Sequence, residues 1–183
     1  AGSTIVVDGT LNATNNASNS GTINVNAGGK LDVDGNLTNN AGGAITNNGT
    51  VEDDLSNAGT IINNLNWSGV VASNTGSLTN TGTWTGNVTS NTGTVSNSGT
   101  WTGNFNSSNG TVTNTGNWNG VLTFTGGRFV STGATSSGAL SFTNSTFDLS
   151  SNNTVGDVAT VNGNLTLGSD STLKVDVDHF GQS

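Results

Sequence analysis

The sequence predicts an all-β fold, a single right-handed parallel β-helix (a solenoid) with short coils of about 17 residues. Three observations lead to this prediction. Residues of one chemical kind recur at a fixed interval in the middle of the chain, apolar and polar residues alternate within each repeat, and the residues that favour helices are scarce. A fixed repeat indicates stacked units, alternation indicates strands, and the lack of helix formers leaves strands as the regular structure.

A 17-residue interval organises the middle of the chain. It separates successive members of several series, which differ in chemistry but keep one phase. Independent series in one phase are typical of proteins whose repeats stack on one another. The series are Trp67, Trp84, Trp101 and Trp118; Leu78, Val95, Val112 and Phe129; Val71, Val88, Phe105 and Leu122; Gly69, Gly86, Gly103 and Gly120; Gly82, Gly99 and Gly116; and Asn80, Asn97 and Asn114.

Alternation within one repeat indicates two clear strands, with room for a short third. Trp101, Gly103 and Phe105 alternate with polar residues and share one face, where Gly103 is expected to make room between two large rings. Residues 107–110 have the composition of a turn. Residues 111–115 alternate again, with Val112 and Asn114 facing inward. Each repeat is therefore expected to form one coil of the solenoid.

Stacked coils place equivalent residues above one another at about 4.8 Å, the distance between paired strands. We therefore expect the Trp and aliphatic ladders to form the core. The Asn ladder is expected at an inward-turned corner, and Asn104 on the outward face. The spacing from Val95 through Trp101 and Phe105 to Val112 is 6, 4 and 7 residues. Unequal sides favour a right-handed helix over a left-handed one, which usually has hexapeptide repeats and equal sides.

The chain is expected to form one domain over residues 1–183, because no linker rich in Pro or charge divides it. Within it, residues 1–66 are expected to form irregular coils, 67–133 the regular repeat, and 134–183 wider C-terminal coils. Gly-Thr-apolar tripeptides mark expected strand starts in the first part, at Leu11, Ile23, Val51 and Ile61. Apolar residues alternate with polar ones in the last part, at Leu165, Leu167, Leu173, Val175 and Val177.

Composition excludes several classes of protein. The absence of Cys removes disulfide scaffolds, thiolate metal sites and thiol nucleophiles. No apolar run is long enough to cross a membrane as a helix, and a net charge of −8 opposes binding to nucleic-acid phosphates. Residues 55–127 contain no Asp, Glu, Lys or Arg. Such a stretch occurs in low-complexity disorder or in a regular solenoid, and the regular spacing favours the solenoid.

The sequence contains few candidate catalytic residues. General acid–base catalysis requires a titratable group held near a partner. The acidic clusters alternate with apolar residues or lie in expected turns, so we interpret them as solvated faces. Arg128 alone borders the uncharged coils, and His179, the sole imidazole, is given no catalytic role. We therefore predict that the chain is not an enzyme and has no catalytic, cofactor-binding or metal-binding residues and no cofactor. The acidic clusters are Asp32 and Asp34; Glu52, Asp53 and Asp54; and Asp176 and Asp178.

A calcium site and an exposed aromatic strip are both disfavoured. Residues 32–35 carry alternating carboxylates but too few oxygen ligands for a calcium cage. The glycine- and aspartate-rich turn of calcium-binding solenoids is absent as well. The Trp series would suit sugar stacking if it were exposed, but its neighbours are polar and Phe105 shares its face, so burial is favoured.

An ice-binding array is disfavoured as well. Thr-x-Thr pairs stand at equivalent positions in two repeats, Thr83 with Thr85 and Thr100 with Thr102. The same positions of the adjoining repeats hold Asn or Ser, whereas a flat Thr array needs more coils than two. The high β propensity of Thr accounts for the pairs in ordinary strands.

The C-terminal end resembles a known family. Residues 163–178 read Gly-Asn-Leu-Thr-Leu-Gly-Ser-Asp-Ser-Thr-Leu-Lys-Val-Asp-Val-Asp, and Gly181-Gln182-Ser183 follow. This segment resembles the region near the C-terminal end of bacterial autotransporter (type V secretion) passenger domains. The Asn, Thr, Gly and Ser-rich coils before it are similar to that family too. His179-Phe180 departs from the pattern, because small residues are more usual there, and so does the strict 17-residue Trp repeat.

The resemblance implies a β-helical fragment exported across the inner and outer membranes, through an outer-membrane β-barrel that belongs to its own precursor. It implies a location at the bacterial cell surface or in the medium, and a role as an adhesin or adhesive stalk. The partner would be a host cell-surface protein, matrix or glycan, bound through arrays of hydroxyls and amides, with no nucleic acid involved. Two alternatives remain: a secreted ligand or virulence factor that engages a host receptor, and a polysaccharide-acting β-helix enzyme. The sequence assigns no binding residues.

Overall fold

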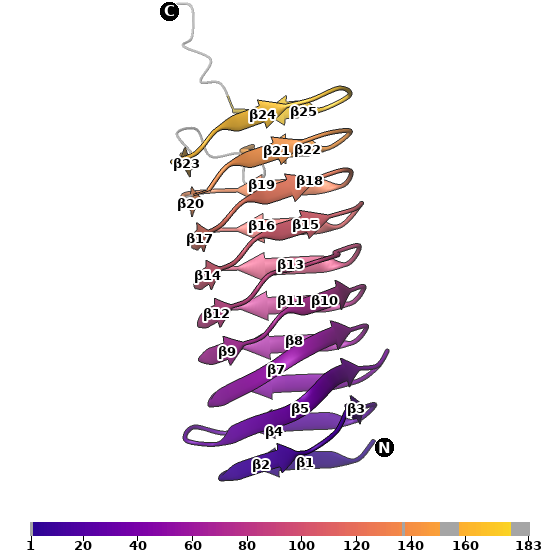
Figure 1. Cartoon of the computed structure of the whole chain (residues 1–183). Coiled ribbons are helices and arrows are strands. Elements are labelled where there is room, and N and C mark those ends of the chain that lie inside the picture. The colour runs from indigo at the N-terminus through magenta and orange to yellow at the C-terminus, as the bar shows by residue number, and fades with distance from the viewer. Residues whose placement is uncertain (1, 137, 151–157, 177–183) are drawn as a thin grey trace, which may run out of the picture.

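The computed structural model describes residues 2–136, 138–150 and 158–176, and this part of the chain contains strands and turns but no helix. Parallel strands stack coil upon coil into a solenoid, with the N-terminal coils at one end and the C-terminal coils at the other (Figure 1). In Figure 1 the near strands run from left to right and the far strands from right to left as the chain climbs, so the helix is right-handed. The predicted right-handed parallel β-helix is confirmed.

The strands form three parallel sheets along the solenoid. The first sheet comprises β1 (Thr4–Val7), β4 (Thr22–Val25), β6 (Ala44–Asn47), β8 (Thr60–Asn63), β11 (Ser77–Asn80), β13 (Thr94–Asn97), β16 (Thr111–Asn114), β19 (Arg128–Ser131), β22 (Thr146–Asp148) and β25 (Thr172–Lys174). The second comprises β2 (Thr10–Ala13), β5 (Lys30–Asn39), β7 (Thr50–Asn57), β9 (Asn66–Ser68), β12 (Thr83–Thr85), β14 (Thr100–Thr102), β17 (Asn117–Asn119), β20 (Thr135–Ser136) and β23 (Thr160–Val161), with β3 (Ala17–Asn19) pairing with β5 and β10 (Val71–Asn74) pairing with β7. The third comprises β15 (Phe105–Ser107), β18 (Leu122–Phe124), β21 (Leu140–Phe142) and β24 (Leu165–Leu167).

A regular coil has three faces, and two of the regular coils in the middle of the chain contribute one strand to each face. In one coil these are β13, β14 and β15, so the short third strand for which the sequence left room is present. Single bridges join Val71 to Val88 and Val88 to Phe105, which continues the third face between β10 and β15. Nearer the N-terminus, β5 and β7 are long and run through the corner between the second and third faces.

Strand register confirms the 17-residue repeat. Leu78 pairs with Val95, and Val95 pairs with Val112, so each residue stands above its equivalent 17 positions away. The interval differs toward the ends: Thr4 pairs with Thr22, and Ile23 pairs with Ile45. Near the C-terminus Leu140 pairs with Leu165 and Thr146 with Thr172, which makes those coils longer.

The four tryptophans form a stacked ladder in the core, as predicted. Their side chains are at most 1% exposed. Successive ring centroids lie 4.6, 4.7 and 4.8 Å apart, with interplanar angles of 7°, 8° and 10°. These distances follow from the strand spacing, because in-register pairing places each ring directly over the ring below. The core thus buries the largest side chains of the chain in one continuous column.

Each indole also makes a hydrogen bond inside the core. Trp101 Nε1 donates to the carbonyl oxygen of Gly86 at 2.9 Å, and Trp118 Nε1 donates to that of Gly103 at 3.0 Å. Trp84 Nε1 donates to the Gly69 carbonyl in the same way at 3.2 Å. These bonds satisfy a polar group that would otherwise be costly to bury. They also tie each coil to the corner of the coil before it.

Gly103 serves a different purpose from the one that the sequence suggested. It does not make room between the Trp101 and Phe105 rings. Its φ is +150°, and a Cβ there would collide with the carbonyl group of Gly86 in the adjoining coil. Gly86 has φ +154° and meets the backbone of Gly69 in the same way. Glycine is therefore required by the close approach of stacked backbones at this corner.

The Asn ladder is buried at an inward corner, as predicted, and is longer than the repeat alone indicated. Asn97 is 0% exposed, and its Nδ2 donates to Asn114 Oδ1 at 2.7 Å and to the Asn117 carbonyl at 3.2 Å. Asn80 Nδ2 donates in turn to Asn97 Oδ1 at 2.7 Å. Each amide thus satisfies its neighbour along the stack. The full ladder comprises Asn47, Asn63, Asn80, Asn97 and Asn114.

A second Asn ladder lies at another corner, which the sequence reading missed. Its members donate from Nδ2 to the Oδ1 of the next coil at 2.7 or 2.8 Å, and Asn91 at its end contacts Ser107 Oγ at 3.4 Å. Unequal coil lengths hide part of this series in the sequence, because its first members are 20 and 18 residues apart. The ladder comprises Asn19, Asn39, Asn57, Asn74 and Asn91.

Asn104 is exposed, as predicted, but its side chain has a structural contact. The backbone N–H of Val121 donates to Asn104 Oδ1 at 3.0 Å, and the backbone N–H of Asn104 donates to Asn87 Oδ1 at 2.8 Å. Outward Asn side chains therefore link coils at the corner that follows the glycines.

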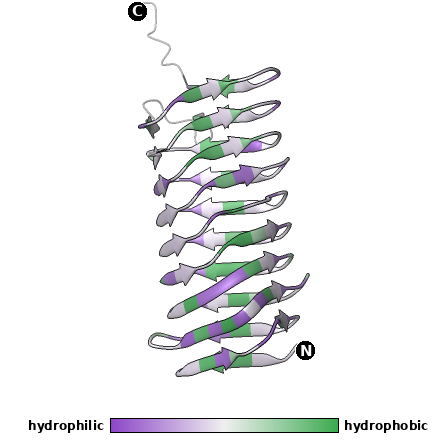
Figure 2. Cartoon of the chain, in the orientation of Figure 1, coloured by the Kyte–Doolittle hydropathy of each residue, from purple (hydrophilic) through white to green (hydrophobic). Residues whose placement is uncertain are grey.

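Apolar residues line the inside of the solenoid along its whole described length. Figure 2 shows them as bands that recur from coil to coil, with a hydrophilic stretch crossing the middle of β7. The coils at both ends expose more of their apolar side chains to solvent. Ile5 is 45% exposed at the N-terminal end, and Leu165 and Leu173 are 46% and 43% exposed at the C-terminal end. Register places Leu165 over Leu140 and Leu173 over Phe147, but every residue of β24 and β25 is exposed to solvent at this end.

Truncation of a central tryptophan should weaken the solenoid strongly. Trp101→Ala removes a ring between two others together with its bond to Gly86, so we expect a loss of about 3–5 kcal/mol in the free energy of unfolding. Denaturant unfolding measures this loss. Trp101→Phe, which keeps an aromatic ring, should lose less. Wild-type tryptophan fluorescence that is quenched freely by iodide would contradict a buried ladder.

The Asn ladder should contribute to stability through its paired amides. Asn97→Ala removes the shortest hydrogen bond that Asn80 donates and the bond that Asn114 Oδ1 accepts inside the core, so we expect a loss of about 1–3 kcal/mol. Asn106→Ala is the matched control, because Asn106 is exposed on the outward face of β15. Equal denaturation midpoints for the two variants would show that the ladder is energetically neutral.

Candidate functional site

The outer face of the second sheet is a regular polar surface. Two columns of polar side chains flank the buried tryptophans there, one on each side, because alternation along a strand turns them outward. All are exposed except Thr100, which is partly buried. We call this set the polar array. It comprises Asn66 and Ser68 on β9, Thr83 and Thr85 on β12, Thr100 and Thr102 on β14, and Asn117 and Asn119 on β17.

The polar array has a fixed geometry. Strand pairing places Thr83 beside Thr100 and Thr85 beside Thr102, so equivalent groups are separated by the strand spacing of about 4.8 Å. Along a strand, the two columns are about 7 Å apart. Hydroxyls and amides both donate and accept hydrogen bonds. The array can therefore bind a flat, uncharged, hydrogen-bonding partner over several coils at once.

The array is not a continuous Thr surface. Thr occupies both columns in β12 and β14 alone, whereas β9 carries Asn66 and Ser68 and β17 carries Asn117 and Asn119. The tryptophans between the columns are buried, so stacking of sugars on an exposed aromatic strip is excluded. Recognition by this face would depend on hydrogen bonds.

A second feature is an acidic hollow of about 420 Å³ where β5 and β7 turn the corner. Asp32, Asp34, Glu52 and Asp54 line it with exposed or partly exposed side chains, as predicted for solvated acids. Lys30 Nζ pairs with Asp32 Oδ2 at 3.0 Å and with Glu52 Oε2 at 2.8 Å. These bonds to Glu52 and Asp32 raise the pKa of Lys30.

Asp53 corrects the prediction that the whole acidic cluster is solvated. It is 3% exposed and lies on β7 between Val51 and Leu55, which are 0% exposed. The alternation of β7 turns Asp53 inward, whereas Glu52 and Asp54 on either side of it are exposed. This phase is readable from the sequence, because Asp53 alternates in step with Val51 and Leu55 along β7.

A third feature is an ionic cluster on the first sheet. Arg128 donates to Asp148 Oδ2 from Nε at 3.0 Å and from Nη2 at 2.7 Å, and Lys174 Nζ lies 3.9 Å from the same oxygen. Ser150 donates to Asp148 Oδ1 from its backbone N–H and from its hydroxyl. Burial alone would raise the pKa of Asp148, but the bonds from Arg128 and Ser150 outweigh it and hold the pKa below its ordinary value. No sequence pattern indicates this cluster, because its members come from coils of unequal length.

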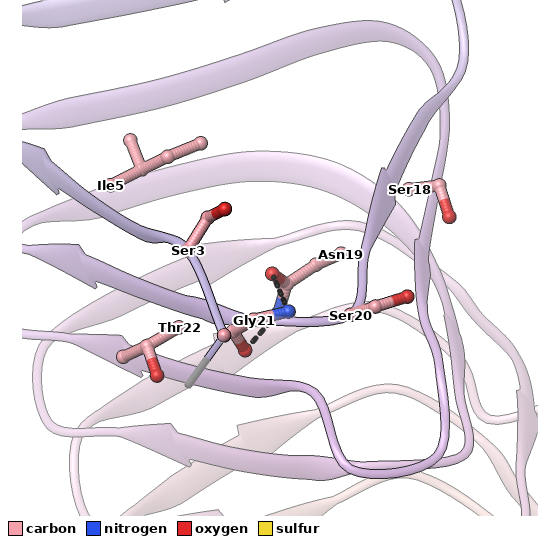
Figure 3. A pocket seen from close by; sticks show the side chains of 8 residues that line it. Ser3, Ile5, Ser18, Asn19, Ser20, Gly21 and Thr22 are labelled. Atoms are coloured by element: carbon pink, nitrogen blue, oxygen red, sulfur yellow. Dashed lines mark hydrogen bonds between the residues drawn. The ribbon is translucent and has the colours of Figure 1, made fainter.

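A hollow of about 430 Å³ lies at the N-terminal end, beside β3 (Figure 3). Asn19, the first rung of the second Asn ladder, exchanges two hydrogen bonds with the backbone of Gly21 there, at 3.1 and 3.2 Å. Ser3, Ser18 and Ser20 also line it. Its lining is small and polar and carries no titratable group, so it offers nothing for acid–base chemistry.

The remaining acidic residues and the histidine do not form a site in the described part of the chain. Among the residues that the structure describes, no three His, Cys, Asp or Glu side chains converge as a metal site. Asp176 is partly buried. Asp178 and His179 lie outside the described residues, as does Val177. No helix in the described part of the chain is long and apolar enough to cross a membrane.

Comparison with protein-family models gives no match for this chain, and comparisons with curated proteins and with solved structures give none either.

The ionic cluster should stabilise the C-terminal coils at neutral pH. Arg128→Gln removes two hydrogen bonds to a buried carboxylate, so we expect a loss of about 1.5–3 kcal/mol at pH 7. A carboxyl whose pKa is lowered by folding stabilises the fold above its ordinary pKa, and this contribution disappears as the pH falls below about 4. The difference between wild type and Arg128→Gln should therefore shrink in acid, as followed by thermal unfolding.

Lys30→Gln is the control for this experiment, because Lys30 forms its ion pairs at the surface and should contribute little. Equal losses for the two variants at pH 7 would contradict the role assigned to Arg128. So would a wild-type advantage that persists unchanged to pH 2.

Proposed function

We propose that the chain is a passenger segment of a bacterial autotransporter that acts as an adhesin or adhesive stalk at the cell surface. The observation that carries the proposal is the polar array on a rigid solenoid, a surface of hydroxyls and amides without charge. The resemblance of residues 163–183 to autotransporter passengers supports the same assignment. The partner class is a host cell-surface protein, matrix or glycan.

The physical case rests on repeated weak contacts. A single hydroxyl or amide contributes little to affinity, because each hydrogen bond replaces one with water. Several coils present the same groups at one spacing, so a repetitive partner can make many such contacts together. Sites linked in this way bind far more tightly than one site alone. A rigid array loses little conformational entropy on binding, which favours the same outcome.

Other classes receive less support from the site. The two hollows are shallow features of the coil ends and corners, and the groups of the acidic hollow are either ion-paired, exposed or turned inward. A soluble ligand for a host receptor would use the same outer faces, and it would differ in acting when detached from the bacterium. Export and surface location are parts of this proposal.

The test is binding of the isolated chain to host cells and to immobilised matrix proteins and glycans. Thr85→Glu combined with Thr102→Glu places two charges in the polar array, and we expect at least a tenfold loss of binding. Ser77→Glu combined with Thr94→Glu is the matched control, because Ser77 and Thr94 face each other on neighbouring strands of the first sheet as Thr85 and Thr102 do on the second. We expect less than a twofold change for the control pair.

Three outcomes would contradict the proposal. Equal losses in both double variants would show that the array is not the binding face. Absence of binding to every surface would remove the adhesin assignment. Release of reducing ends from a polysaccharide panel would indicate an enzyme instead.

A further inference from the structure

The corner between β5 and β7 places one ionisable side chain inside the core. Asp53 is 3% exposed, and neither of its carboxyl oxygens has a partner in hydrogen-bond geometry. By contrast, its backbone carbonyl is hydrogen-bonded, because Trp67 Nε1 donates to it at 3.1 Å. In the following coils the equivalent carbonyls belong to Gly69 and Gly86. Asp53 therefore puts a carboxyl group at a corner where those coils have no side chain.

The pairing of β5 with β7 is interrupted at this place. Asp32 pairs with Glu52 and Asn36 pairs with Asp54, so residues 33–35 of β5 face Asp53 alone. The acidic hollow lies against the same corner, and Asp53 is among the residues that line it. The carboxyl thus sits where the ladder of backbone bonds is locally broken and where solvent is near.

The charged groups near Asp53 are mostly acids, and none of them provides a cation that pairs with its carboxyl. On β5 these groups are Lys30, Asp32 and Asp34, and on β7 they are Glu52 and Asp54. The Lys30 ammonium is already bound by Asp32 and Glu52. The other two strands paired with β7, β9 and β10, contain no titratable residue.

These surroundings favour the neutral carboxyl. Burial raises the pKa of Asp53 to about 7, and the charges of Asp32, Asp54 and Glu52 add to the shift. The nearby backbone N–H of Val33 lowers the pKa and so opposes the shift in part, but it does not reach hydrogen-bond geometry with either carboxyl oxygen. An ionised carboxylate left unpaired in an apolar core is costly, whereas a neutral carboxyl is far less so. Water entering from the hollow, or separation of the corner, would relieve that cost.

We propose that Asp53 is a proton-operated switch for the N-terminal coils: the corner between β5 and β7 is closed when its carboxyl is neutral and loosens when the proton leaves. This inference does not depend on the adhesin assignment. It concerns a local opening around β5 and β7, and the Trp ladder beyond it begins at Trp67, one coil away.

The direction of the pH effect follows from linkage. The carboxyl has its ordinary pKa near 4 when the corner is open and about 7 when it is closed. The closed form therefore binds the proton more tightly, and its advantage is complete below about pH 4. Between about pH 4 and 7 the ratio of open to closed molecules should rise about tenfold per pH unit, and above about pH 7 it should stay constant.

The experiment compares wild type with Asp53→Asn, which keeps the shape and stays neutral at every pH. Amide hydrogen exchange of β5 and β7, corrected for the intrinsic pH dependence of exchange, measures the opening from pH 4 to 8. We expect protection in wild type to fall across this range relative to Asp53→Asn, by up to about a thousandfold. Protection in β16 should not change, because a solenoid opens locally.

Asp54→Asn is the matched control. Asp54 is exposed and accepts a bond from the Val70 N–H at 2.7 Å, which an amide oxygen can also accept. This variant should retain most of the wild-type pH dependence, because burial of Asp53 is the largest cause of its raised pKa and the charge of Asp54 is a smaller one. If wild type and Asp53→Asn lose protection equally with pH, the proposal is wrong. If Asp53→Asn does not fold, carbon NMR titration of the Asp53 carboxyl in wild type decides, and a midpoint near pH 4 would overturn the proposal.

Discussion

In-register stacking of coils is the constraint on which the rest of this structure depends. Parallel pairing places each residue directly over its equivalent in the adjoining coil, so in the regular part most side chains lie between neighbours of similar chemistry. A residue type that recurs inside must therefore pack well against itself. Flat indole rings meet this condition at 4.6–4.8 Å. Amides meet it as well, because each Asn can donate to the next and accept from the one before.

The same constraint explains why the regular coils carry no charge. A charged residue that repeats at the coil interval would stand opposite a like charge on the neighbouring strand, which is destabilising. Residues 55–127 avoid this by containing no Asp, Glu, Lys or Arg. Thr, Ser and Asn replace charge as the source of solubility on the outer faces. The surface that results is the polar array, so the feature proposed to bind a partner also follows from how the coils stack.

Charges appear where the coils become irregular, and the two carboxyls that are buried in the described part of the chain have opposite environments. Asp148 is bound by Arg128 and Ser150 and is stabilised in its ionised form. Asp53 has no such partner, and burial favours its neutral form. Both carboxyls are nearly inaccessible, so burial alone does not set their behaviour. The presence or absence of a nearby cation decides whether the group stabilises the fold at neutral pH or makes it sensitive to pH.

The sequence alone determined the coil interval, the inward position of the tryptophans and the existence of an Asn ladder, because a strict repeat forces equivalent residues into register. It did not determine why glycine stands at Gly103, since the collision that a Cβ would make is with the backbone of Gly86, 17 residues away. The second Asn ladder and the Arg128–Asp148 contact were also hidden, because coils of unequal length remove the period that reveals partners. Asp53 lies between these cases: its inward phase is in the sequence, but its lack of a partner is a property of the packed corner. Tertiary structure alone decided that point, because the cation closest in sequence, Lys30, is bound by other carboxylates.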